Sequence, residues 1–245
     1  MRIGLLTILL MTMSILETTT AMGQDVNNKK NTSVLKIGIL VAMEKEYNLL
    51  KDIAINDQVV IRQCGIGKVN AAMACVEMIR EQHPDIVLTL GCAGGNGSEL
   101  SLGDVIVSTE TAYHDVYCGE DVLYGQVQGM PTRYESPKWL IERACKINER
   151  VVPGLIVSGD WFVDSKQKMS EIIGHFPEAK AVDMESAAIA QVCYKYQIPF
   201  VSLRIISDIP MSGEHASQYA GFWNTVSNKT FSIANEFVKQ ITGKK

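Results

Sequence analysis

Residues 181–208 read AVDMESAAIAQVCYKYQIPFVSLRIISD, and this stretch predicts how the rest of the chain is arranged. Two carboxylates, Asp183 and Glu185, follow a short apolar segment at the point where alanine-rich helical sequence begins. The nearly continuous apolar run Phe200–Ile206 is typical of a strand buried on both faces of a sheet. Ligands of open α/β sheets bind beyond the carboxyl ends of the strands, so we expect Glu185 and Asp208 to face one crevice.

Each charged residue of this stretch also has a purely structural interpretation. Glu185 is in place to cap the helix that follows it, Asp208 is a common turn residue, and Arg204 has a partner in either acid. The placement of both acids at the ends of two different strands favours the functional interpretation.

Strands alternate with helices on both sides of this stretch. We expect strands in residues 34–42, 59–63, 85–90, 104–108 and 154–158, and helices in residues 69–82, 137–148, 165–174 and 222–241. The glycine-rich residues 91–95 follow a predicted strand, so we expect a loop there whose backbone amides approach a ligand. This order predicts an α/β fold with a mainly parallel sheet covered by helices.

The composition indicates one globular domain and excludes some partners. The chain has 245 residues, of which 47% are hydrophobic and 20% are charged. Its net charge of -4 provides no basic field for nucleic acid, and no run of Lys and Arg is long enough to follow a nucleic-acid backbone. Nucleic acid is therefore not an expected partner.

The N-terminus has the pattern of a secretory signal. An apolar core follows Met1-Arg2, and small residues at Ala21 and Gly23 fit a cleavage site. We predict a signal peptide in residues 1–23, a polar linker in residues 24–33 and the folded domain in residues 34–245. The protein is then exported to the periplasm or secreted, without membrane attachment after processing; if the segment is not used as a signal, the protein is cytoplasmic.

The six cysteines are scattered through the sequence, and several lie in apolar segments. This distribution is typical of small buried residues in a reducing compartment, rather than of a disulfide framework. It conflicts with the signal-like N-terminus, and the sequence does not resolve the conflict.

Several familiar catalytic motifs are absent or incomplete. Gly65-Ile66-Gly67-Lys68 lacks the spacing of a nucleotide P-loop, and Val69 stands where a magnesium-binding Ser or Thr is required. Residues 91–97 resemble a dinucleotide fingerprint only loosely. The sequence has no G-x-S-x-G, H-E-x-x-H or C-x-x-C pattern. His114 and Asp115 form a possible acid/base pair, but adjacent side chains usually point apart.

A set of acids at strand ends remains. Glu46 follows the first predicted strand, and it joins Glu185 and Asp208 with an aromatic residue at Phe162 and a cation at Arg204. This set suits a substrate that has a ring to stack on and hydroxyls to bind, and whose bond is cleaved by acid on one side and water on the other. An N-glycosidic bond has these properties.

The motifs of the chain occur in the order found in a known family. These motifs are Ala42-Met43-Glu44-Lys45-Glu46, residues 65–69, residues 91–95, Tyr113-His114-Asp115, residues 154–160, Asp183-Met184-Glu185 and residues 204–208. In them the chain resembles the bacterial 5'-methylthioadenosine/S-adenosylhomocysteine nucleosidases, within the nucleoside phosphorylase and hydrolase family. The resemblance extends from Leu35 to the C-terminus, and it implies a single-domain three-layer sandwich with a mixed, mainly parallel sheet flanked by helices.

The resemblance implies a role for each acid. Asp208 would protonate the adenine N7, which requires a pKa raised by burial. Glu46 would activate the attacking water. Glu185 and Arg204 would hold the ribose hydroxyls, and anionic Glu185 would stabilise the positive charge that develops on the ribose. Phe162 would stack on adenine. The other substrate-binding positions are the backbone at Val163, Met184 at the ribose face, Ser207 beside Asp208, and Gly94.

The resemblance also implies that the enzyme needs no cofactor or metal and forms a homodimer. Three positions depart from the family pattern. Cys92 replaces a serine that helps to hold the water, Asp183 replaces a glutamate, and Gln128 replaces a proline in a loop that closes the 5' pocket of the neighbouring subunit. The selectivity for the 5' group is therefore the property that the resemblance transfers least well.

Other activities remain open on the same fold. A phosphorylase would need cations where phosphate attacks, but Glu44 and Glu46 would repel that anion. A hydrolase for another nucleoside, such as futalosine, would use the same machinery. A secreted binding module is a fourth possibility, which the presence of all three acids and Arg204 disfavours.

Overall fold

The computed structural model describes residues 35–53, 58–97, 99–225 and 228–243, within a compact unit that runs from Val34 to Lys245. The predicted signal peptide and linker lie outside the described residues, so they and the export of the protein stay predictions. Within the described ranges, no helix has the length and apolar character needed to cross a bilayer.

The described elements alternate as the sequence predicts. The strands are β1 (Ile37–Val41), β2 (Val59–Gln63), β3 (Ile86–Gly95), β4 (Val105–Tyr113), β5 (Tyr134–Glu135), β6 (Val151–Ser158), β7 (Ala179–Asp183) and β8 (Phe200–Asp208). The helices are α1 (Glu44–Leu50), α2 (Lys68–Gln82), α3 (Lys138–Cys145), α4 (Lys166–His175), α5 (Ser186–Tyr196), α6 (His215–Thr225) and α7 (Asn228–Thr242).

The sheet is mixed and mainly parallel. The pairs β1–β2, β1–β3, β3–β8, β4–β6 and β6–β7 are parallel, whereas β3–β7, β4–β5 and β4–β8 are antiparallel. The predicted α/β fold with helices flanking such a sheet is thereby confirmed.

The pairing also closes part of the sheet into a ring. Strand β3 pairs with β8 from Val87 to Gly94, with a shift of register between Ala93 and Gly94, and Gly94 and Gly95 also pair with β7. Because β8 pairs with β4, and β4 connects to β7 through β6, the strands β3, β8, β4, β6 and β7 form a closed circuit. A glycine is required where β3 bends, since a Cβ on Gly95 would lie 2.9 Å from Cγ2 of Ile206.

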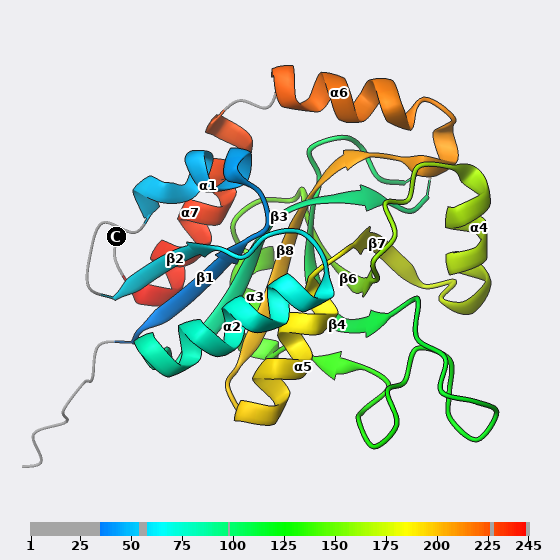
Figure 1. The fold of residues 1–245 in the computed structure, drawn as a ribbon. Helices are drawn as coiled ribbons and strands as arrows, with labels where there is room; N and C mark the ends of the chain where they lie inside the picture. The colour runs from blue at the N-terminus through cyan, green and yellow to red at the C-terminus, as the bar shows by residue number, and fades with distance from the viewer. Residues whose placement is uncertain (1–34, 54–57, 98, 226–227, 244–245) are drawn as a thin grey trace, which may run out of the picture. The chain divides into compact units, whose positions relative to one another are not determined.

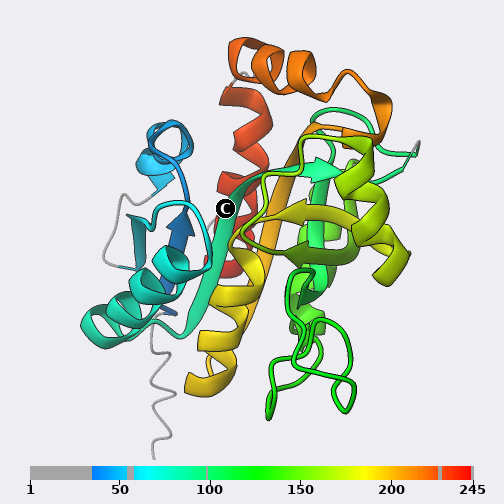
Figure 2. The same cartoon turned by 45° about the vertical axis from the view of Figure 1, so that its right-hand side comes forward.

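Helices cover both faces of the sheet. Helices α2 and α5 lie side by side on one face, and α1, α3 and α7 lie on the other (Figure 1). The turned view separates these two groups of helices and shows α6 and α4 near the carboxyl ends of the strands (Figure 2). The buried side chains of β1, β3, β4 and β8 form one core with those of α3 and α7, and a second core lies under α2 and α5. The two helical layers leave the carboxyl ends of the strands open to a ligand.

Two sequence predictions are wrong in detail. Residues 91–95 are not a loop but the end of β3, because their backbone groups pair with β8 and β7. The predicted terminal helix of residues 222–241 is divided between α6 and α7. Ser227 and Asn228 are residue types that favour a new helix start, a signal that the prediction of one helix overlooked.

The six cysteines are free thiols in this structure, and the prediction that they are buried holds for only two of them. Cys75 and Cys193 are buried, Cys118 is exposed, and Cys64, Cys92 and Cys145 are partly buried.

Candidate active site

A pocket lies where the carboxyl ends of β1, β3, β7 and β8 meet, and we call it the strand-end pocket. It contains about 620 Å³ of unfilled space, a volume that includes open solvent at its mouth. Of the predicted site residues, Arg204 lies beneath the pocket, and all others line it. Those lining residues are Glu46, Gly94, Phe162, Val163, Met184, Glu185, Ser207 and Asp208.

Glu46 is buried at the first turn of α1, and backbone amides fix its carboxylate. One oxygen, Oε2, accepts hydrogen bonds from Ala42 N at 3.0 Å and Met43 N at 2.9 Å, and Oε1 accepts one from Cys92 N at 2.9 Å. Burial raises the pKa of Glu46, against the opposing effects of Arg204 and these three amides. A fixed carboxylate with a raised pKa suits a base that receives a proton from water.

Cys92 lies beside Glu46 in the pocket and is mostly buried. Burial, followed by the nearby Glu46 carboxylate, raises the pKa of its thiol well above the usual value, so it is protonated. A neutral thiol is a weaker hydrogen-bond donor than the hydroxyl of a serine.

Gly91 makes room for the charged groups beneath the pocket. A Cβ atom at this position would lie 2.5 Å from both Oε1 of Glu46 and Nη1 of Arg204. Both of these side chains are buried, so neither has space to retreat. The first glycine of residues 91–95 therefore serves side-chain packing rather than the approach of a ligand to backbone amides.

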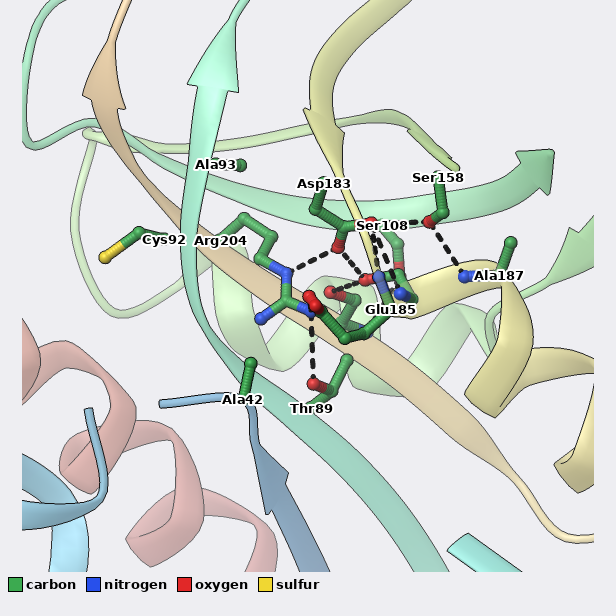
Figure 3. Close-up of polar contacts among 12 residues, drawn as sticks. Ala42, Thr89, Cys92, Ala93, Ser108, Ser158, Asp183, Glu185, Ala187 and Arg204 are labelled. Carbon is green, nitrogen blue, oxygen red and sulfur yellow. Dashed lines mark hydrogen bonds and ion pairs between the residues drawn. The ribbon is translucent and has the colours of Figure 1, made fainter. Parts of the chain in front are cut away.

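The guanidinium of Arg204 is almost fully buried and binds the acids that follow β7 (Figure 3). Its Nε donates to Oδ2 of Asp183 at 2.6 Å, and its Nη2 donates to the Thr89 hydroxyl at 3.2 Å. The same Nη2 lies 3.6 Å from Oε2 of Glu185. The resemblance implies that Arg204 helps to hold the ribose hydroxyls and orients Glu185; its shortest described contact is the ion pair with Asp183.

Asp183 is held as an anion by its neighbours. The Ser158 hydroxyl and Arg204 donate to it (Figure 3). The Ser186 hydroxyl donates to it as well. Burial alone would raise its pKa, but Arg204 and the two hydroxyls hold the pKa below its usual value. The Ser158 hydroxyl also accepts from Ala187 N at 2.9 Å, so Asp183 fixes the first turn of α5 and with it the position of Glu185.

Glu185 is buried directly before α5 and points to the pocket. Its Oε1 accepts a hydrogen bond from Gly67 N at 3.0 Å, at the N-terminus of α2. Burial raises the pKa of Glu185 to about 7, with Arg204 opposing the shift and Asp183 adding to it. Its carboxyl group therefore changes charge near neutral pH, and such shifted groups are common at functional sites.

Asp208 ends β8 in a different environment. Its Oδ1 accepts from the Ser207 hydroxyl at 2.7 Å, and that hydroxyl also lies 3.2 Å from the Ala93 carbonyl oxygen. Burial raises the pKa of Asp208, although Ser207 and His215 lower it in part. A carboxyl group that keeps its proton to higher pH suits a general acid.

Aromatic side chains form another wall of the pocket. Phe162 is 52% exposed and packs edge-to-face against Tyr219 of α6, with 5.5 Å between ring centroids. Trp161 and Ile66 line the same space. Sequence reasoning missed Tyr219, Trp161 and Ile66 as pocket residues, because aromatic and aliphatic side chains carry no signal that separates a pocket wall from a core.

His114 is buried and does not form an acid/base pair with Asp115. Neither ring nitrogen has a hydrogen-bond partner within the described structure, and the ring packs edge-on against Trp161. Burial lowers its pKa, so the imidazole is neutral. The described residues also include no cluster of three or more His, Cys, Asp or Glu side chains placed to hold a metal ion.

Comparison with known proteins agrees with this geometry. The model of the Phosphorylase superfamily matches residues 53–239. The 5'-methylthioadenosine/S-adenosylhomocysteine nucleosidase of an Exiguobacterium strain is 42% identical over 202 residues, which are 71% of this chain and 85% of that protein. The chain belongs to the phosphorylase superfamily, among these nucleosidases.

Solved structures of the superfamily share the fold. The nucleosidase of the same name from Neisseria meningitidis, in complex with methylthio-immucillin-A, is 38% identical with a TM-score of 0.77, and the match covers 83% of this chain and 98% of that one. The futalosine hydrolase of Helicobacter pylori is 27% identical with a TM-score of 0.75, over 86% of this chain and 98% of that one. The suspected family resemblance is thus confirmed.

We predict that Arg204→Met lowers the free energy of unfolding by about 3 to 5 kcal/mol, because it leaves the buried Asp183 anion without its cation. Chemical denaturation measures this difference. The matched control is Arg62→Met, since Arg62 pairs with Glu77 and Glu81 at the surface. Its effect should stay below about 1 kcal/mol. Equal effects of the two substitutions would contradict the importance of the buried pair.

Proposed function

We propose that this protein hydrolyses the N-glycosidic bond of 5'-methylthioadenosine and S-adenosylhomocysteine, releasing adenine and the thioribose product. The observation that carries the proposal is the arrangement of three acids, Glu46, Glu185 and Asp208, around one pocket with an aromatic wall. The names of the related nucleosidases, and the methylthio-immucillin-A in one of them, support the same substrate class.

Asp208 acts as the general acid. Burial keeps its proton at a pH where an exposed aspartate is ionised, and the Ser207 hydroxyl fixes the orientation of the carboxyl group. Transfer of that proton to adenine N7 allows the base to leave as a neutral molecule. A positioned proton donor of this kind contributes about 10² to 10⁴ in rate.

Glu46 orients the attacking water and takes its proton. Three backbone amides hold both carboxylate oxygens, so the side chain does not move away from the water during the reaction. Fixed groups of this kind lose little free energy to reorganisation when charge develops.

Glu185 accepts hydrogen bonds from the ribose hydroxyls and stabilises the oxocarbenium-like ribose. Arg204 acts mainly from beneath, since its guanidinium binds Asp183 and lies beside Glu185. Phe162 stacks on adenine, the backbone at Val163 contacts the edge of the base, and Met184 packs against the ribose. Gly94 and Ser207 complete the binding surface.

The charges around the pocket favour water over phosphate as the nucleophile. The described residues that line it include four acids but no Lys or Arg. The guanidinium of Arg204 is buried and already paired with Asp183. An incoming phosphate would therefore meet repulsion from Glu46 without a free cation to offset it.

A second candidate is hydrolysis of futalosine or another nucleoside with a different 5' group. The similarity to the Helicobacter pylori futalosine hydrolase favours this alternative, because the two folds match over most of both chains. Comparison of kcat/KM for 5'-methylthioadenosine, S-adenosylhomocysteine and futalosine decides between the candidates.

Adenine release by the purified protein from 5'-methylthioadenosine tests the proposed function. We expect release at the same rate with and without added phosphate, measured by separation of the free base. Release that requires phosphate would identify a phosphorylase and remove the assigned role of Glu46. Absence of release under both conditions would move the assignment to another nucleoside or to a binding module.

We predict that Asp208→Asn lowers kcat by about 10² to 10⁴ and leaves binding of a substrate analogue nearly unchanged. In the wild-type protein kcat should fall as pH rises through the raised pKa of Asp208, because the acid loses its proton; the variant should lack this fall. Asp164→Asn is the matched control, since Asp164 pairs with Lys168 at the surface. Nearly full activity of Asp208→Asn would contradict its role.

The protein is further proposed to form a homodimer through the outer face of α2. Val69 and Met73 are four residues apart on this face, with exposed fractions of 69% and 59%. Ile66, directly before the helix, is 51% exposed and lines the strand-end pocket. A partner seated on this face would therefore also touch the pocket, where the loop around Gln128 of the second subunit would close the 5' end.

Sedimentation analysis should give a mass twice that of the 27.0 kDa chain. The double substitution Val69→Glu with Met73→Glu should produce a monomer with reduced kcat/KM, because charges on the apolar face prevent association. Leu102→Glu is a control at another exposed apolar position. A wild-type monomer would exclude the proposed dimer.

A further inference from the structure

The N-terminus of α2 holds two carboxylates through two successive amides. Gly67 N donates to Oε1 of Glu185 at 3.0 Å, and Lys68 N donates to Oδ1 of Asp160 at 2.8 Å. The first amides of a helix have no partner within it and carry partial positive charge, so both contacts are favourable. The position of the ribose-binding carboxylate therefore depends on where this end of α2 lies.

Asp115 fixes the same helix end from a third segment. Its Oδ2 accepts from Nζ of Lys68 at 2.6 Å and from Asp160 N at 2.8 Å. The Asp115 side chain is only 8% exposed, so its charge depends on Lys68 for compensation. We call Lys68, Asp115 and Asp160 the α2 anchor; they join α2 to the segments that follow β4 and β6.

The α2 anchor leaves little freedom for the amide that binds Glu185. Gly67 has φ of +93°, a conformation that other residues rarely adopt. A Cβ on Gly67 would lie 2.9 Å from Oδ1 of Asp160, so backbone and carboxylate are in close contact. A change at Asp160 should therefore be transmitted directly to the adjoining Gly67 amide.

The α2 anchor is also connected to the pocket wall that we propose contacts adenine. Asp160 immediately precedes Trp161, Phe162 and Val163, which line the pocket. The Asp160 amide donates to Asp115, and the Asp160 carboxylate accepts from the N-terminus of α2. Asp160 therefore connects the segment proposed to stack on adenine with the helix end that holds Glu185. None of the three anchor residues lines the strand-end pocket, so they act through others.

We propose that Lys68, Asp115 and Asp160 are positioning residues that hold Gly67 N–H against Glu185 and thereby set the recognition of the ribose hydroxyls. This inference rests on the proposed function, since it concerns the nucleoside that the pocket takes. It adds to the proposed function three residues outside the pocket whose contribution to kcat/KM should depend on the ribose hydroxyls of the substrate.

The test compares Asp160→Ala with the wild-type protein on 5'-methylthioadenosine and on its 2'-deoxy and 3'-deoxy analogues. With the full substrate, kcat/KM of the variant should fall about 10- to 100-fold, the effect of one charge-assisted hydrogen bond. On the analogue that lacks the hydroxyl bound by Glu185, the same substitution should cost less than about threefold, because coupled contacts are not additive. The intrinsic reactivity of the analogue cancels, since each ratio compares two proteins on one substrate.

Two further variants test whether the loss of activity in Asp160→Ala comes from the lost hydrogen bond to Lys68 N. Asp160→Asn keeps an oxygen that accepts from Lys68 N, and it should recover most of the activity, to within about fivefold of wild type. Asp164→Ala removes an exposed carboxylate from the same segment, and it should change kcat/KM less than about twofold on every substrate. If Asp160→Ala does not fold, Lys68→Met supplies the same comparison, because it removes the cation that holds Asp115.

Equal losses for Asp160→Ala on the full substrate and on both deoxy analogues would overturn the inference, since the α2 anchor would then act on the fold alone. This outcome differs from failure of the proposed function. A wild-type protein that releases no adenine would remove both, whereas a wild-type protein with normal release and equal losses would remove only the positioning role.

Discussion

The buried guanidinium of Arg204 is the charge on which the rest of the site depends. It lies at the centre of β8 and faces Asp183, Glu185 and Glu46, all of which are buried. Removing several carboxylates from water costs several kcal/mol for each ion unless a cation and hydrogen bonds compensate. Arg204 provides that compensation, and Gly91 provides the space in which it approaches Glu46.

The buried acids differ in how far nearby cations and hydrogen bonds compensate their charge, and their pKa values differ accordingly. Asp183 has Arg204 and two hydroxyls, so its pKa is low and it serves as a fixed anion. Glu185 is farther from the cation, and its pKa rises to about 7. The pKa of Asp208 depends on burial, Ser207 and His215, and it is raised as a proton donor requires. One cation placed asymmetrically thus separates the pKa of Asp183 from that of Glu185, whereas the pKa of Asp208 is set mainly by its burial.

The backbone around the acids holds this asymmetry in place. Glu46 is bound by two amides of the turn between β1 and α1 and by one amide of β3, and Glu185 is bound by the amide of Gly67, directly before α2. These amides belong to elements that the closed circuit of strands and the helix layer fix against one another. The same contacts therefore serve substrate recognition and stability. In this way the α2 anchor affects the pocket without lining it.

The sequence by itself determined the alternation of strands and helices, the position of the acids at strand ends and the membership of a family, because these are local patterns. It did not determine the structure of residues 91–95, which we expected to be a loop at the ligand and which form the end of β3, paired with both β8 and β7. It also missed Tyr219 and the α2 anchor. Pairings between residues such as Lys68, Asp115 and Asp160, far apart along the chain, depend on which strand ends the fold brings together, and only the tertiary structure decides that.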